Sequence, residues 1–177
     1  MRLSWGRDLV ATLAVSLALV LQVSVFSHWS WHGVVPDLVL LVVVAAGLAH
    51  GTEYGMVLGF AAGLLLDLAP PADQVAGRWA LALLVVGYVA GRLGTSLPAA
   101  PRLPQTLAVA AACSFVGTSV FAITGLVLRD PAVDVPELLR VTLAALAWDV
   151  ALAALVIPAV LRGFDRAQPQ RAFVTSP

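Results

Sequence analysis

Three carboxylates that adjoin or interrupt long apolar runs are the residues best suited to chemistry in this chain. Asp37 and Asp67 lie at the two ends of a Gly-rich apolar stretch, and Asp149 lies near the middle of the apolar run 138–161. A charged side chain at the centre of a membrane helix costs about 2.5–3.5 kcal/mol on insertion scales, so a carboxylate there usually marks a functional contact. Asp149 therefore indicates a binding or assembly contact, or a proton path.

A local hydrogen bond is the alternative interpretation of Asp149. A protonated carboxyl at this position could donate to a hydroxyl on the preceding apolar run, where Ser114, Thr118 and Ser119 are the candidates. Paired carboxylates also share a proton in aspartyl proteases. The residues before Asp67 are Gly-Leu-Leu-Leu, however, and they lack the Gly-x-Gly-Asp signature of intramembrane aspartyl proteases. The carboxylates thus favour binding or structure over catalysis.

The histidines offer little further chemistry. His28 and His32 are four residues apart, a spacing that some metal sites use, but only Asp37 follows nearby as a third ligand. Trp29 and Trp31 lie between the two histidines, and tryptophans of this kind anchor a chain at the membrane interface. Since all three histidines fall near predicted interfaces, a buried Ser–His pair is not expected. The sequence predicts no catalytic residue, no metal site and no cofactor.

The positions of Asp37 and Asp67 relative to their helices differ in an informative way. Asp37 follows Pro36 at the start of a predicted helix, where the helix dipole favours an anion. Asp67 falls at the end of a predicted helix, where the dipole disfavours it. A specific contact is therefore expected for Asp67, with the Arg78 side chain as one candidate partner. The two acids could also bind a cation together.

A row of glycines precedes Asp67. Gly55, Gly59 and Gly63 are spaced four apart and share one face of a helix. Small residues at this spacing let two helices approach closely inside lipid. The row predicts a close helix–helix contact, either inside the fold or with a partner protein, and packing inside the fold is the favoured interpretation.

Composition defines the elements that must position these residues. The 177 residues are 60% hydrophobic and only 11% charged, whereas a soluble domain is about a quarter charged. The predicted fold class is all-α, a polytopic membrane protein with six transmembrane helices at 9–26, 34–50, 55–69, 79–97, 105–128 and 138–161. The second and third segments are short for a span, so a re-entrant hairpin is the alternative there. Residues 1–162 would form one membrane domain, and 163–177 a disordered polar tail.

Charge excludes several functions and sets the orientation. No arginine cluster is dense enough to suggest nucleic-acid binding. The absence of lysine excludes a Walker-type phosphate loop and Schiff-base chemistry, and the single cysteine, Cys113, excludes an internal disulfide. Seven of the ten arginines fall on the side of both termini, which the positive-inside rule makes cytoplasmic. The first segment is longer than a signal-peptide core and is interpreted as a retained helix.

Several motifs, taken in order, resemble the family of the rod shape-determining membrane protein MreD. They are Pro36-Asp37-Leu38 at the second predicted helix, the row Gly55, Gly59 and Gly63 running into Leu64-Leu65-Leu66-Asp67, Gly87-Tyr88-Val89-Ala90-Gly91 in the fourth helix, and Pro158 near the end of the last. The resemblance covers about residues 8–162. The lack of lysine departs from most members.

The resemblance implies a non-catalytic component of the bacterial elongation machinery in the cytoplasmic membrane. Its implied partners are MreC, the glycosyltransferase RodA, a class B penicillin-binding protein and, directly or indirectly, the MreB cytoskeleton; a homodimer is left open. It also implies the six-helix fold of the substrate-binding components of energy-coupling-factor transporters. The alternative function is therefore a vitamin-binding transporter subunit, for which Ala14 and Ala18 would form the docking face of the first helix. In either case one set of residues is expected in helix packing or partner contacts: Pro36, Asp37, Gly55, Gly59, Gly63, Asp67, Gly87, Gly91 and Asp149.

Overall fold

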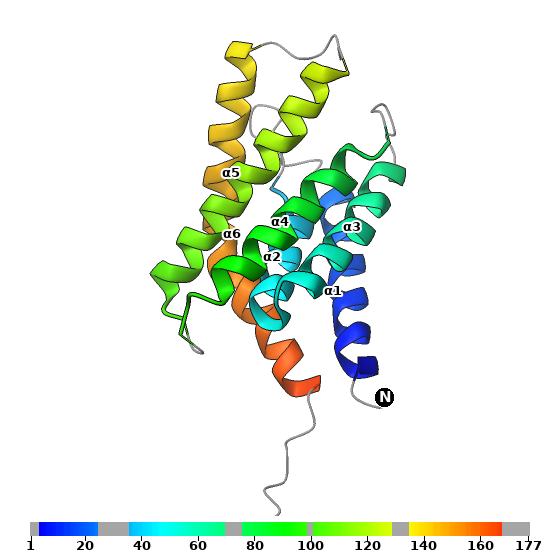
Figure 1. Ribbon diagram of the computed structural model, residues 1–177, viewed down its shortest axis with the longest axis vertical. Coiled ribbons are helices and arrows are strands. Elements are labelled where there is room, and N and C mark those ends of the chain that lie inside the picture. Colours follow the sequence, from blue (N-terminus) through cyan, green and yellow to red (C-terminus); the bar gives the residue numbers. More distant parts are fainter. Residues whose placement is uncertain (1–3, 25–35, 70–75, 99–100, 129–134, 168–177) are drawn as a thin grey trace, which may run out of the picture.

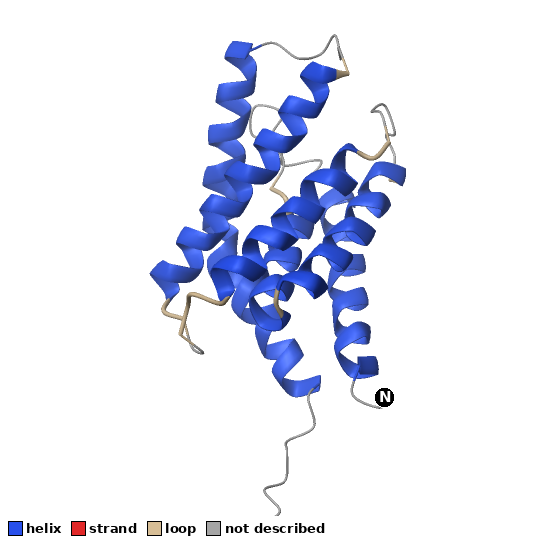
Figure 2. Cartoon of the chain, in the orientation of Figure 1, coloured by secondary structure: helices blue, strands red, loops and turns tan. Residues whose placement is uncertain are grey.

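The computed structural model describes residues 4–24, 36–69, 76–98, 101–128 and 135–167, and every regular element in these ranges is an α-helix (Figure 2). The helices are α1 (Ser4–Ser24), α2 (Leu38–His50), α3 (Thr52–Leu68), α4 (Arg78–Gly94), α5 (Leu103–Val127) and α6 (Val135–Ala167). Each overlaps one of the predicted segments. The all-helical class is therefore confirmed.

Three of the described helices are long and apolar enough to cross a membrane. The qualifying segments are Trp5–Ser24, Leu103–Val127 and Thr142–Ala167, and Leu38–His50 is a shorter apolar helix. Large apolar side chains cover the outside of the bundle; Leu13 and Leu17 on α1 and Leu155 on α6 are each at least 60% exposed. Such a surface suits lipid and is unfavourable in water. These features are those of a membrane protein.

Consecutive helices run in alternating directions (Figure 1). Helix α1 begins at the lower end of the view, where α2, α4 and α6 end and α5 begins; we call this the terminal end. The other end holds the start of α4 and of α6, and we call it the opposite end. Helices α5 and α6 are the longest, so they extend beyond α2, α3 and α4 toward the opposite end.

Helix α2 is the core of the bundle. All ten residues from Leu38 to Gly47 are buried, because α1, α3, α4, α5 and α6 all pack around this helix. A helix enclosed on every side needs no polar face, which explains its uninterrupted run of Leu and Val. The start of α2 consequently lies inside the protein, where backbone polar groups have no access to water.

The last helix is longer than the sequence indicated. Residues 163–167, which we expected in a polar tail, continue α6, and Phe164 among them is 1% exposed. The apolar ring of Phe164 packs at the terminal end of the bundle, where it gives these residues a reason to stay helical. The rest of the predicted tail, and the pair His28 and His32, lie outside the described residues.

Candidate functional site

The carboxylate of Asp149 lies at the centre of the protein and accepts two hydrogen bonds. Its Oδ1 accepts from the backbone N–H of Asp37 at 2.8 Å, and its Oδ2 accepts from the Ser114 hydroxyl at 2.6 Å. Asp149 and Ser114 are both fully buried. The contact joins the middle of α6 to α5 and to the start of α2. Of the three hydroxyls considered for Asp149, Ser114 is the one in contact.

The first turn of α2 is capped by side chains from three elements. Besides the bond to Asp149, Asp37 Oδ1 accepts from the Leu40 N–H at 2.9 Å, and Gln22 Oε1 on α1 accepts from the Val39 N–H at 3.2 Å. The buried Pro36 precedes this turn and has no N–H to satisfy. A helix start leaves its first N–H groups without helical partners, so these acceptors supply what water cannot.

Asp67 caps the start of α4. Its carboxylate accepts from the backbone N–H groups of Gly77 at 2.8 Å, Trp79 at 3.1 Å and Ala80 at 3.1 Å. These groups belong to the start of α4, where Gly77 adopts φ +99°. The carboxylate at the end of α3 is therefore stabilised by the positive end of the α4 dipole. This contact resolves why an acid stands at the unfavourable end of its own helix.

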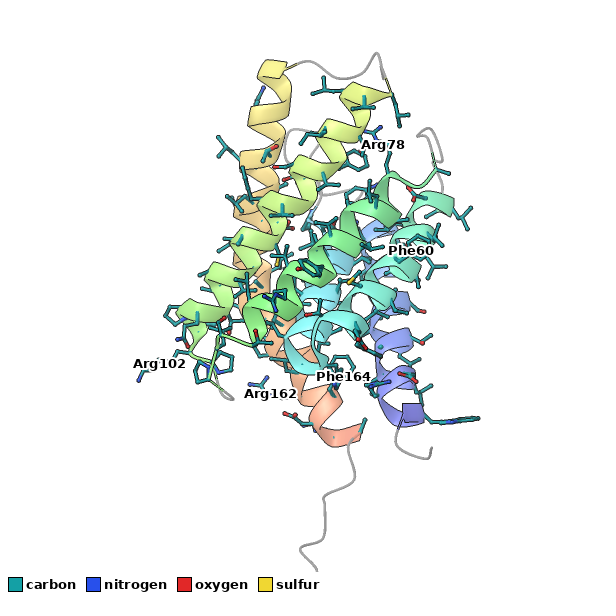
Figure 3. The ribbon with its side chains drawn as sticks, viewed as in Figure 1. Phe60, Arg78, Arg102, Arg162 and Phe164 are labelled. Atoms are coloured by element: carbon teal, nitrogen blue, oxygen red, sulfur yellow. The ribbon has the colours of Figure 1, made fainter. Side chains whose placement is uncertain are left out.

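Arg78 makes its described contacts with α5. Its guanidinium lies 4.0 Å from the centroid of the Phe121 ring, and Nη2 donates to the Phe121 carbonyl oxygen at 3.1 Å. The side chain is buried, at 5% exposure. Figure 3 shows Arg78 near the opposite end of the bundle, where α4 and α5 lie side by side. This arginine thus joins the start of α4 to the upper part of α5.

The glycine row of α3 faces α4 at backbone contact distance. A Cβ on Gly59 would collide with the backbone carbonyl group of Leu83, and a Cβ on Gly55 would lie 2.6 Å from the carbonyl oxygen of Gly87. At Gly63 it would lie 2.6 Å from the backbone nitrogen of Ala80. Any side chain at these positions therefore needs the two helices to separate.

The glycines of α4 complete this contact. Gly87 lies against the Gly55 carbonyl group, and Gly91 against the backbone of Thr52. Gly47 on α2 also joins, since a Cβ there would lie 2.8 Å from Ala90 Cβ and 3.0 Å from the Gly91 nitrogen. We call the set Gly47, Gly55, Gly59, Gly63, Gly87 and Gly91 the glycine interface. Its six glycines pack α2, α3 and α4 against one another.

A second polar cluster closes the terminal end. The Tyr54 hydroxyl donates to Asp8 Oδ1 at 3.2 Å, and the Arg7 guanidinium lies 4.2 Å from the Tyr54 ring centroid. His50 stacks edge-on against Tyr54 and against Phe164, with ring centroids 5.0 and 4.6 Å apart. Burial, and secondarily the Asp8 charge, raise the pKa of Tyr54 to about 12, so its hydroxyl remains a donor. The cluster holds α1, α2, α3 and α6 together.

The structure brings together residues that the sequence left separate. Asp37 and Asp149 are 112 residues apart in the chain yet in direct contact. Sequence reasoning missed Gln22 and Gly47. A lone amide in an otherwise apolar run was the available signal for Gln22, and an additional small residue upstream of the row was the signal for Gly47. Among the described residues, no group of three or more His, Cys, Asp or Glu side chains could hold a metal ion.

The chemistry of this arrangement is structural. The carboxylates of Asp149 and Asp67 both accept backbone N–H groups from a neighbouring helix, which fixes helix positions. The protein is thus a helical membrane bundle in which glycines and acids, Asp149 buried and Asp67 half-buried, hold the helices in register. The model of the family of rod shape-determining protein MreD matches residues 4–161. The chain therefore belongs to the MreD family. No match is found among curated proteins or among solved structures.

Proposed function

We propose that this protein is a non-catalytic scaffold of the elongation machinery in the bacterial cytoplasmic membrane. Membership of the MreD family, over nearly the whole chain, carries the proposal and implies a role in rod shape determination. The geometry adds support, since the buried carboxylates are engaged in capping helices. In this role the protein would help couple peptidoglycan synthesis to cell shape.

The proposed topology has six spans with both termini in the cytoplasm. Support comes from the alternating helix directions (Figure 1) and from the arginines: Arg92, Arg102, Arg162 and Arg166 belong to helix ends or loops at the terminal end. Figure 3 shows Arg102 and Arg162 at that end and Arg78 toward the other. A cytoplasmic terminal end follows from the positive-inside rule. Residues 1–162 would then form the membrane domain.

The proposed partners are MreC, RodA with a class B penicillin-binding protein, and MreB directly or through them. The surface for such contacts is the exposed apolar exterior, because Asp37, Asp67, Asp149 and the glycine interface are already engaged inside the bundle. These residues would then act on partner binding indirectly, by fixing the positions of the helices that partners contact.

Affinity purification from native membranes tests the proposal. The tagged protein would be extracted in mild detergent, and co-purifying proteins identified by mass spectrometry against a tagged, unrelated multi-helix membrane protein. Recovery of MreC with RodA or a penicillin-binding protein is expected. Recovery of a coupling subunit with ATPases instead would overturn the scaffold and indicate vitamin uptake.

A further inference from the structure

The charged residues of α3 and α4 bound these two helices at the same interval. Glu53 and Asp67 are the charged residues of α3, and Arg78 and Arg92 are those of α4. The two members of each pair are 14 positions apart, which is about 21 Å along a helix. The residues between them are uncharged and mainly apolar on both helices.

Contacts between α3 and α4 bring these charges to two common levels. Gly91 lies against the backbone of Thr52, so the adjacent residues Arg92 and Glu53, both exposed, belong to the same level at the terminal end. At the opposite end, Asp67 accepts from backbone N–H groups at the start of α4. The pair of helices is therefore bounded by charge at both ends.

Large apolar side chains face outward between the two levels. Val57, Phe60, Leu64 and Leu65 on α3 and Leu81 on α4 are exposed, and we call these five residues the α3–α4 face. Figure 3 shows Phe60 on α3 at a level between that of Arg78 and the terminal end. In a membrane this face would contact lipid chains, since its side chains are apolar and exposed.

Helices α5 and α6 offer a longer apolar surface. The 25 residues of α5 contain no charge and measure about 37 Å. In α6, Arg140 and Arg162 are 22 positions apart, or about 33 Å, and Asp149 between them is buried. Both helices match a hydrocarbon core of about 30 Å.

The α3–α4 face is short for the same hydrocarbon core. Its charges are about 9 Å too close together, and α3 and α4 counted in full, at 17 residues each, measure only about 26 Å. Figure 1 shows both helices running obliquely to α6, so their height along the bundle is less than their length. One side of the protein thus matches a bilayer of ordinary thickness, and the other is too short for it.

We propose that the α3–α4 face thins the bilayer beside it and so selects lipids with short acyl chains. A membrane accommodates an apolar surface shorter than its hydrocarbon core by thinning locally. Non-helical backbone exposed to lipid is not tolerated inside the core, so the headgroups must approach the end of α3 and the start of α4. The proposal rests on the six-span topology proposed above and not on the scaffold role.

Fluorescence quenching at single sites tests this selection. In a Cys113→Ala background, a bimane label would be attached at Phe60→Cys on the α3–α4 face or, as the matched control, at Leu155→Cys on α6, where the side chain is 71% exposed. The full chain would be reconstituted in brominated dioleoyl phosphatidylcholine mixed with unbrominated phosphatidylcholine of shorter or longer chains. An unbrominated lipid that binds beside the label relieves quenching, so relative affinity is measured at each site.

At the Phe60→Cys site we expect dimyristoleoyl lipid to be preferred over dierucoyl lipid roughly threefold or more. The Leu155→Cys site should show a much weaker preference, because the apolar length of α6 matches the bilayer. Equal preferences at the two sites would overturn the proposal. So would a label at Phe60→Cys that brominated lipid does not quench, since protein would then cover this face.

A paired substitution changes the length of the face itself. Glu53→Leu with Arg92→Leu replaces the two exposed charges at the terminal end by apolar side chains, so the preference at Phe60→Cys should fall toward that at Leu155→Cys. Glu53→Gln with Arg92→Gln removes the same charges but keeps the level polar, and it should retain most of the preference. An equal loss in both paired variants would contradict the length argument. The preference for short chains is measured without partner proteins, so it can fail or hold whether or not MreC is recovered.

Discussion

At the scale of single residues, Asp37, Asp67 and Asp149 accept hydrogen bonds from backbone N–H groups at helix starts. An unsatisfied backbone group in a membrane interior costs several kcal/mol, comparable to or larger than the insertion cost of a carboxylate. The start of α2 lies inside the bundle, level with the middle of α6, since Asp37 contacts Asp149. The carboxylate of Asp149 therefore offsets the free-energy cost of burying the backbone N–H of Asp37 at the enclosed start of α2.

Removing the Asp149 carboxylate should destabilise the fold strongly. In Asp149→Ala the Asp37 N–H and the Ser114 hydroxyl lose their acceptor, and each unsatisfied buried group costs about 1–3 kcal/mol. We expect a loss of about 3 kcal/mol or more, measured as a lower temperature of thermal unfolding in detergent. Asp149→Asn keeps one oxygen for the Asp37 N–H and an amide that can donate to Ser114, so it should be much milder.

The Ser114→Ala variant separates the two bonds of Asp149. It leaves the bond to the Asp37 N–H in place, so its effect should be smaller than that of Asp149→Ala. If Asp149→Ala unfolded at the wild-type temperature, the capping role would be excluded. If Asp149→Asn folded normally but lost its partners, a charged contact with a partner would be indicated instead.

Asp67 allows the same test at the start of α4. Asp67→Ala removes the acceptor for the N–H groups of Gly77, Trp79 and Ala80. Loss of an N-cap costs about 0.5–2 kcal/mol, and the three bonds place this variant at the upper end. Hydrogen exchange should report faster exchange confined to the first turn of α4. Unchanged exchange there would contradict the assignment, and Asp67→Asn, which keeps one acceptor oxygen, is the control.

At the scale of helices, the glycine interface makes α2, α3 and α4 one packed unit. Side chains on all three are small where the helices approach, so the backbones touch and dispersion attraction acts over many atoms. This packing replaces the hydrophobic effect, which contributes little between helices in lipid. No side chain can be added at the glycines of this interface without separating the helices.

Gly59→Ala tests this packing with the smallest available change. In an exposed helix, alanine would be favoured over glycine by about 1 kcal/mol. At Gly59 the added Cβ collides with the Leu83 carbonyl group, so we expect a net loss of stability of about 1–3 kcal/mol. Gly59→Leu should be worse. Thermal unfolding in detergent measures both effects.

Gly94→Ala is the matched control, because a Cβ there would approach Leu48 no closer than 3.3 Å. It should remain within about 1 kcal/mol of the wild type. Equal stability of Gly59→Ala and Gly94→Ala would show that α3 and α4 do not pack as described. If only partner binding were lost in Gly59→Ala, the row would instead face a partner.

How far the sequence determined these elements depends on the kind of signal. The apolar runs and the row Gly55, Gly59 and Gly63 were visible because their periods follow from helix geometry alone. The row defined a face of α3 but could not say that α4 covers it. The end of α6 was misjudged because polar neighbours masked one apolar residue, Phe164, whose burial depends on tertiary contacts with His50.

The sequence identified individual residues of the candidate site but not the contacts that they make with one another. The position of Asp67 at the end of its helix, where the helix dipole disfavours an acid, indicated that this side chain needs a partner. Its partners are backbone N–H groups, however, and backbone groups leave no pattern in the sequence. The contact between Asp37 and Asp149 depends on the depth at which α2 begins. That depth is set by how five helices enclose α2, and no local pattern encodes it.

At the scale of the whole molecule, the two ends of the bundle differ in charge and in length. The exposed arginines Arg92, Arg102, Arg162 and Arg166 belong to the terminal end, and α5 and α6 extend past the other helices at the opposite end. In a membrane this asymmetry would fix the orientation, since each arginine resists transfer across the bilayer.

Cysteine labelling tests this orientation in the intact fold. Cys113, the single cysteine of the chain, is fully buried, so a Cys113→Ala background should not react with a membrane-impermeant maleimide. Thr95, in the turn after α4, and Leu128, at the end of α5, are exposed at opposite ends. Thr95→Cys should react in inside-out vesicles only, and Leu128→Cys in right-side-out vesicles only. The reverse pattern would place both termini outside the cell, and reaction of both positions from one side would exclude six full spans, because α5 could not then cross the bilayer.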